Sequence, residues 1–293
     1  MKNTKKITIA LLIVSVVSLP LFAAEKEETA PKWSWNQGFS WHLGADATTN
    51  YLLRAWNYGG LAFQPHASVS YAGATVAAWA NIGSKDWAFE QFNPQLNITL
   101  SYSLFGLTVG VTHLHYFSSA YFDFKGKTYE EYINNTGNWN QTELFATYQA
   151  PDFFPIRLSW YTYIAGNDMF PDIDRPIKDG DEIVGYEMKR TFSTYIELAY
   201  KFKLPMDFTL TPAVGISPWK GYYTRNEGNF ALKNIEFRVE RPHQINEHCS
   251  YNVYAVLMLD CYKVTKKNLI TTIDNTWSNQ RLNLAIGTAI NFY

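Results

Sequence analysis

The sequence predicts an all-β protein, a transmembrane antiparallel up-and-down β-barrel of about 12 strands. Three observations support this fold class. Apolar and polar side chains alternate over many short segments, short turns alternate with long connections, and aromatic residues reach 17% although the mean hydropathy is only −0.22. Barrel strands with one face in lipid and one in water alternate in this way, and aromatic residues gather at both membrane surfaces. A soluble sandwich of two sheets has no reason to sort its connections by length.

The beginning of the chain has the pattern of a signal peptide. Lys2, Lys5 and Lys6 precede an apolar run from Ile7 to Leu19, and the small pair Ala23–Ala24 follows. A retained membrane anchor is the alternative, but a spanning helix needs about 20 apolar residues and this run is shorter. We therefore expect three regions: a signal peptide over 1–24, a periplasmic N-terminal lead-in over 25–37 and an outer-membrane β-barrel over 38–293.

The most regular stretch, from Gln95 to Phe117, predicts a β-hairpin. Every second residue up to Leu104 is apolar or aromatic, and the residues between them are Gln, Asn, Thr and Ser. A tight turn at Phe105–Gly106 follows, and the same alternation resumes from Leu107. Residues two apart on a strand lie on the same side, so each strand has one oily face and one polar face.

Weaker versions of this alternation predict ten further strands. They cover residues 39–49, 61–71, 74–82, 142–149, 155–164, 191–202, 208–216, 251–261, 269–273 and 281–292. Pro65 falls on an outward face, and the faces of 74–82 are ambiguous because Val76 and Trp79 have opposite parity. The pattern is weakest over Leu269–Ile273, and Leu232–Val239 is a candidate further strand inside a loop.

Connections between these segments alternate in length. Short breaks lie near residues 72, 105, 151 and 204, and long connections cover 118–140, 164–190 and 217–249. In outer-membrane barrels the short turns face the periplasm and the long loops face the outside. The alternation therefore predicts a cell outer-membrane location, with lipid as the surroundings of the barrel.

The C-terminus carries a pattern that outer-membrane proteins share. Gly287, Ile290 and Phe292 fit a G-x-x-Φ-x-Φ ending, where Φ is a hydrophobic residue, with Tyr293 one residue beyond the usual terminal aromatic. This resemblance implies that the three residues form an assembly signal, and that the barrel assembly machinery is a partner.

A family resemblance covers roughly residues 38–203. The stretch Asn50–Arg54, then Gln64–Ser68, then Tyr71–Asn81 resembles the opening three strands of the TorF-type porin family, an outer-membrane β-barrel family. Glu143 and the Tyr195–Glu197 segment look like that family's recurring strand glutamates. Ala55 replaces the usual Gly after the Arg, a departure in the first loop. The resemblance implies a porin architecture and supplies no substrate.

If the apolar faces meet lipid, the polar faces line the barrel interior. The predicted lumen-lining and selectivity residues are His42, Asp46, His66, Glu143, Arg157, Glu197, Lys201 and Arg281. One interpretation is a channel for passive diffusion of small polar solutes, whose mixed charges set selectivity. The other is a plugged barrel without transport, closed by ion pairs such as Glu143 with Arg157. Twelve strands lie between the filled eight-stranded and the open sixteen-stranded barrels.

Other candidate sites leave alternatives open. Cys249 and Cys261 could pair in an oxidising periplasm, or Cys261 could be a small apolar strand residue. His113 and His115 could bind a metal with a loop carboxylate, or lie at the membrane interface. The acidic loop 171–182 could take Ca²⁺, although its spacing fits a solvated external face better.

An enzyme is the rival functional class. Lipid hydrolysis at the outer rim would need a Ser activated by a His, for which His113 and His115 with Ser118 or Ser119 are candidates. No nucleophile motif surrounds them, so we expect no enzyme, no cofactor and no metal. A net charge of −1 without a basic block makes nucleic acid an unexpected partner.

Overall fold

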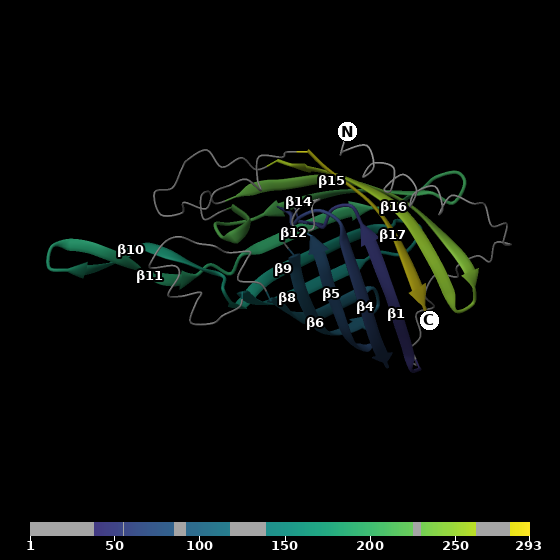
Figure 1. Ribbon diagram of the computed structural model, residues 1–293, viewed down its shortest axis with the longest axis horizontal. Coiled ribbons are helices and arrows are strands. Elements are labelled where there is room, and N and C mark those ends of the chain that lie inside the picture. The colour runs from purple at the N-terminus through teal and green to yellow at the C-terminus, as the bar shows by residue number, and fades with distance from the viewer. Residues whose placement is uncertain (1–37, 55, 85–91, 118–138, 225–229, 262–281) are drawn as a thin grey trace, which may run out of the picture.

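The computed structural model describes residues 38–54, 56–84, 92–117, 139–224, 230–261 and 282–293, which form a closed antiparallel β-barrel (Figure 1). Its wall strands are β1 (Ser40–Thr48), β4 (Ala62–Tyr71), β5 (Ala74–Ser84), β6 (Phe92–Leu104), β7 (Leu107–Tyr116), β8 (Trp139–Gln149), β9 (Ile156–Gly166), β12 (Thr194–Tyr200), β14 (Thr209–Ser217), β15 (Ala231–Asn246), β16 (Cys249–Asp260) and β17 (Leu282–Phe292). The two-residue β13 (Phe202–Lys203) continues β12 along β14. The predicted fold class is confirmed.

Two pairings close the barrel. The first wall strand β1 pairs with the last, β17, from Leu43 opposite Phe292 to Thr48 opposite Gly287. In the middle of the chain β12 pairs with β14, from Ile196 opposite Ile216 to Ala199 opposite Ala213. Neighbouring strands elsewhere are consecutive wall strands, as an up-and-down meander requires. Of the described helices, none is long and apolar enough to cross a membrane.

The two rims of the barrel differ in their connections. One rim, called the turn rim below, carries the beginning of β1, the end of β17 and the short turns. At Ala72–Gly73 the φ angles are 49° and 86°, and at Phe105–Gly106 they are 50° and 78°. Two successive positive φ values match the right-handed twist of a hairpin, so these turns are tight. The opposite rim, called the loop rim, carries the longer connections.

The predicted alternation of apolar and polar side chains is present in the wall strands, with apolar side chains outside and polar side chains inside. In β6 the side chain of Leu100 is 62% exposed on the outside, whereas Gln95 is 1% exposed on the inside. The outside is an apolar belt that includes Leu43, Phe63, Val69, Val76, Ile98, Leu100, Val109, Val111, Leu158, Leu198, Val214, Phe237, Val253, Leu257, Leu284 and Ile286. Exposed aromatic residues gather at the turn rim, namely Phe39, Trp41, Tyr71, Tyr102, Phe105, Tyr148, Phe153, Phe154, Phe202 and Phe292.

The candidate further strand at Leu232–Val239 is confirmed, but it does not lie inside a loop. It belongs to the 16-residue wall strand β15, so the predicted long connection 217–249 is wrong and the connection after β14 covers only 218–230. Leu269–Ile273 lies outside the described residues, and β16 is hydrogen-bonded directly to β17. The twelfth wall strand is therefore β15. Its alternation is interrupted because a bulge lies opposite Gly215–Ile216, which shifts the register at Lys233.

Two further expectations are corrected by the topology. The connection 164–190 is not a plain loop, because β10 (Met169–Asp179) and β11 (Glu182–Arg190) form a hairpin that projects from the barrel (Figure 1). Cys249 is the first residue of the 12-residue β16, and Cys261 directly follows its last residue, Asp260. At about 3.3 Å per residue they are far beyond the reach of a disulfide, so the pairing is excluded.

Candidate functional site: the barrel interior

The structure places most of the predicted lumen residues on the inner face of the wall. Those inside are His42 and Asp46 on β1, His66 on β4, Glu143 on β8, Arg157 on β9 and Glu197 on β12. Lys201 follows β12 at the turn rim and is exposed, and Arg281 lies outside the described residues. Their role in selectivity stays a prediction.

A buried ion pair lies at the centre of the loop-rim half. The guanidinium of Arg54 contacts both carboxylate oxygens of Glu143, with Nη2 at 2.9 Å from Oε1. Arg54 Nη1 also donates to the Tyr223 hydroxyl at 2.7 Å, and the guanidinium stacks 3.8 Å above the Tyr161 ring. The two charged side chains are only 11% and 5% exposed. A two-pronged contact of this kind fixes both position and orientation of the Arg.

The segment between β1 and β4 folds inward to deliver Arg54. It contains the two-residue strands β2 (Leu52–Leu53) and β3 (Trp56–Asn57), and Arg54 turns the chain between them with a φ of 50°. Tyr51 stacks on the ring of Tyr58 at a centroid distance of 5.1 Å, and its ring is tilted against that of Trp79 at 5.4 Å. These contacts hold the segment against the inner wall, so the turn points into the barrel.

Aromatic side chains surround the ion pair and fill this half. We call the group formed by Arg54 and six tyrosines the tyrosine plug. The six tyrosines are Tyr51, Tyr58, Tyr116, Tyr163, Tyr195 and Tyr223. The ring of Tyr223, from the short 3-10 helix η2 (Tyr222–Thr224), lies 5.9 Å from that of Tyr163 and 5.5 Å from that of Tyr195. Burial raises the pKa of the Tyr223 phenol to about 12, with Arg54 opposing the shift, so this hydroxyl is neutral at pH 7.

A buried carboxylate ties two connections together beneath the plug. Asp168 accepts hydrogen bonds from the Ser193 amide at 2.9 Å, the Ser193 hydroxyl at 2.5 Å and the Thr191 hydroxyl at 2.9 Å. The Ser193 oxygen in turn accepts from the amide of Tyr222, the first residue of η2, at 2.5 Å. The base of the β10–β11 hairpin therefore positions η2 and the Tyr223 side chain.

The turn-rim half of the interior holds charges that face water. Arg157 pairs with Glu197 across β9 and β12 at 3.0 Å, with side chains 45% and 17% exposed. Arg238 and Glu240 on β15 pair at 2.8 Å. The expected pair of Glu143 with Arg157 is therefore wrong, because each has another partner. This half therefore contains charges of both signs.

Sequence reasoning missed several interior residues. The predicted lumen residues do not include Arg54, which belongs only to the family resemblance. They also do not include Glu236, Arg238 and Glu240, although the segment 232–239 is a candidate further strand. A signal is present in the sequence for the three residues of β15 only. Charged residues alternate with Ile235, Phe237 and Val239, which is the pattern of a wall strand. For Arg54 no local pattern says that the turn folds inward.

The two histidines of β7 point outward. His113 Nδ1 lies 3.1 Å from the Thr142 hydroxyl, and His115 contacts the Asn140 side chain and the ring of Phe117. Ser118 and Ser119, the candidate nucleophiles, lie outside the described residues. Within the described part the hydroxyl beside these imidazoles is that of Thr142, on the same outward face.

The proposed assembly-signal residues occupy both faces of β17. Ile290 and Phe292 are exposed on the outer belt. Gly287 faces inward beneath the ring of Tyr254, where an added Cβ would lie 2.4 Å from a ring carbon. Packing against Tyr254 therefore explains why a glycine is needed at position 287. The recognition of the three residues by the assembly machinery stays a prediction.

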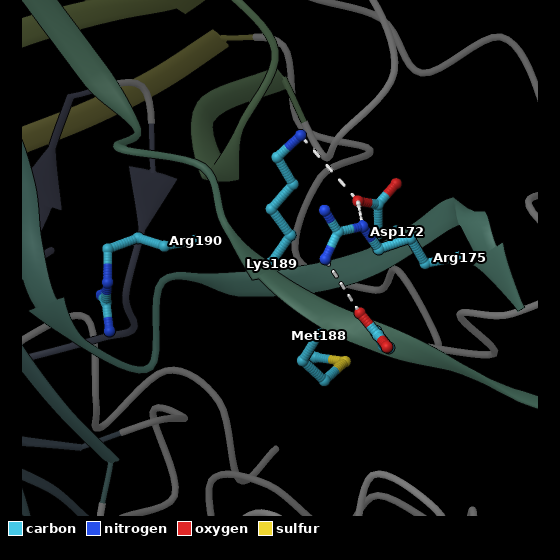
Figure 2. Close-up of a pocket in the computed structure, with 6 residues that line it drawn as sticks. Asp172, Arg175, Met188, Lys189 and Arg190 are labelled. Atoms are coloured by element: carbon cyan, nitrogen blue, oxygen red, sulfur yellow. Dashed lines mark hydrogen bonds and ion pairs between the residues drawn. The ribbon is translucent and has the colours of Figure 1, made fainter. Parts of the chain in front are cut away.

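A further polar cluster lies on the β10–β11 hairpin, outside the barrel. Asp172 faces Arg175 and Lys189 at 3.9 Å each, and Arg175 pairs with Glu187 at 3.2 Å. Together with Met188 and Arg190 these side chains line a hollow of about 340 Å³. Figure 2 shows the ion-paired side chains close together and Arg190 pointing away from them. Because Asp172 is neutralised by two bases rather than grouped with other acids, the hairpin has the features of a solvated face and not of a Ca²⁺ site.

Comparisons with known proteins find similarity to solved structures only. No protein-family model and no curated protein matches the chain. The NanC porin structure is 11% identical with a TM-score of 0.46, covering 86% of this chain and 99% of that one. Outer membrane phospholipase A from Escherichia coli is 10% identical with a TM-score of 0.36, covering 88% and 93%. The CymD monoaromatic hydrocarbon channel is 9% identical with a TM-score of 0.38, covering 88% of each chain. At these TM-scores the likenesses carry no argument about function, and the fold assignment rests on the strand register.

Proposed function

We propose that this protein is an outer-membrane porin-like channel for passive diffusion of small polar solutes, with its narrowest point at the tyrosine plug. The observation that carries the proposal is a closed wall with an apolar belt outside and water-facing charges of both signs inside. A charge on a lipid-facing wall costs about 2–4 kcal/mol near the midplane, whereas an interior charge is solvated or paired. The wall therefore separates a lipid side from a polar pathway.

The proposal includes an orientation and a maturation step. Residues 1–24 are removed as a signal peptide, the barrel is inserted by the assembly machinery, and the turn rim faces the periplasm. The exposed aromatic residues of the turn rim support this placement, because such residues anchor a barrel at the membrane interface. No catalytic step and no cofactor are part of the proposal.

The tyrosine plug gives the proposal its selectivity element. Solutes that enter the charged turn-rim half meet Arg54, Glu143 and Tyr223 before they reach the loop rim. Charged and hydrogen-bonding groups at a constriction set which solutes pass. A plugged barrel without transport is the competing interpretation, and the burial of the ion pair favours it.

Planar-bilayer conductance separates the two. We expect the wild-type barrel to conduct, and the double substitution Arg54→Ala with Glu143→Ala to conduct more, because it removes the constriction without leaving one buried charge unpaired. The matched control is Arg175→Ala with Glu187→Ala, which removes an exposed ion pair outside the barrel. A wild type that is silent at all voltages would refute passive diffusion. If only the double variant conducts, the tyrosine plug closes the wild-type barrel. If neither protein conducts, the channel proposal fails and only the barrel fold is retained.

A further inference from the structure

Four polar side chains surround Gly44 on the inner wall near the turn rim. His66 on β4 and Asn291 on β17 are its neighbours across the two adjacent strands, and His42 and Asp46 are its neighbours along β1 on the same face. Because Gly44 has no side chain, the groups around it share the space above its backbone. A Cβ there would lie 2.4 Å from His66 Nε2 and 2.7 Å from Asn291 Oδ1.

The two imidazoles each direct their Nε2 atom at the same side-chain oxygen. Nε2 of His42 lies 3.0 Å and Nε2 of His66 lies 3.3 Å from the same oxygen, Oδ1 of Asn291. The rings are stacked with centroids 5.0 Å apart, and Tyr293 stacks on the other side of His42 at 5.4 Å. The Tyr293 hydroxyl is held by Ser250 at 2.8 Å. Two imidazole nitrogens and an amide oxygen thus converge on the water-facing interior.

Asp46 lies behind one of the imidazoles. Its Oδ2 is 3.9 Å from Nδ1 of His66, the ring nitrogen that faces away from the convergence point. A carboxylate at the distal nitrogen is the usual partner of a metal-binding His, because it fixes the tautomer and raises the basicity of the ligating nitrogen. The carboxylate thus lies on the side of His66 from which a metal-binding imidazole is usually supported, at ion-pair distance and not at hydrogen-bond distance.

We propose that His42, His66 and Asn291 bind a divalent transition-metal ion such as Zn²⁺, with Asp46 orienting His66. Imidazole nitrogens suit Zn²⁺, Cu²⁺ and Ni²⁺, and water from the interior completes an open coordination shell. The described residues hold no group of three or more His, Cys, Asp and Glu side chains suited to a metal. The proposed site therefore has two imidazole ligands and takes its third protein ligand from the amide oxygen of Asn291. The negative charge of Asp46 favours a cation over an anionic solute. Binding is an exchange of water for protein ligands, with both imidazoles neutral.

The site depends on the barrel fold and not on conductance, so the two proposals fail separately. Zn²⁺ is titrated into the purified, folded, untagged full chain in detergent, and the bound heat and stoichiometry are measured. We expect one equivalent to bind. His42→Gln and His66→Gln, which keep a hydrogen-bonding side chain of similar length, should each weaken binding at least about tenfold, and Asp46→Asn about 10- to 100-fold.

The matched control is His113→Gln with His115→Gln, which removes two imidazoles on the outer face of the same barrel and should leave the stoichiometry unchanged. Heat-dependent migration on a denaturing gel verifies that each variant is folded. Absence of Zn²⁺ binding to the folded wild type, or its loss in the outer-face control alone, would overturn the proposal and leave a hydrogen-bonded imidazole cluster only.

Discussion

The two halves of the barrel interior use the same chemistry in different surroundings. Both contain an Arg–Glu pair between side chains far apart in the sequence, but Arg54 and Glu143 are 11% and 5% exposed, whereas Arg157 and Glu197 are 45% and 17% exposed. In the loop-rim half aromatic rings replace water around the pair, and in the turn-rim half water remains. An ion pair in the first setting is costly to break, and one in the second contributes little.

The largest expected effect comes from removing one partner of the buried pair. Glu143→Gln leaves the Arg54 guanidinium buried without its counter-charge, and we expect a loss of about 3–5 kcal/mol in the free energy of unfolding. Denaturant titration of the folded barrel in detergent measures it. The double substitution with Arg54→Ala should recover a large part of this loss. A loss below about 1 kcal/mol would mean that the ion pair in the loop-rim half is as accessible to solvent as the one in the turn-rim half.

A smaller effect is expected at the hydroxyl that Arg54 contacts. Tyr223→Phe keeps the ring in the plug but removes the acceptor at 2.7 Å from Nη1, for an expected loss of about 1–3 kcal/mol. Tyr163→Phe is the comparison, because its hydroxyl is 3.4 Å from that of Tyr223 and does not contact the guanidinium in this way. Equal losses in both variants would argue against a specific role of the Arg54 contact.

The same phenol predicts a dependence on pH. The pKa of Tyr223 is raised from 10.0 to about 12, first by burial, so ionisation is easier in the unfolded chain. Its contribution to stability is therefore complete below about pH 10 and declines as the pH rises from 10 towards 12. Unfolding titrations across this range should show a steeper decline for the wild type than for Tyr223→Phe. Identical slopes would contradict a buried phenol.

The smallest effect on stability is expected in the turn-rim half. Arg157→Ala opens the pair with Glu197 where water can solvate the remaining carboxylate, so the free energy of unfolding should change by about 0–1 kcal/mol. Its effect should appear in transport instead, as a shift of the reversal potential towards cation selectivity in a salt gradient. Arg175→Ala on the projecting hairpin is the control, with no shift expected. A large stability loss for Arg157→Ala would remove the distinction between the halves.

The contrast between β6 and β15 shows where the local alternation of side chains predicts a strand and where it does not. In β6 the alternation is unbroken, and its two faces were predicted residue by residue. In β15 a bulge at Lys233 shifts the register, so the sequence predicts only a candidate strand inside a loop there, although Ile235 to Glu240 alternates. A bulge depends on the neighbouring strand, so a single segment does not reveal it.

The sequence alone determined which side of each regular segment is oily and where the tight turns lie, because side chains alternate every two residues and turn residues act locally. The tertiary structure decided which interior charges meet. Arg54 is 89 residues from Glu143, and the contact requires that the connection between β1 and β4 fold inward onto β8. Such partners follow from strand stagger and loop path around the closed wall, which no short stretch of sequence encodes.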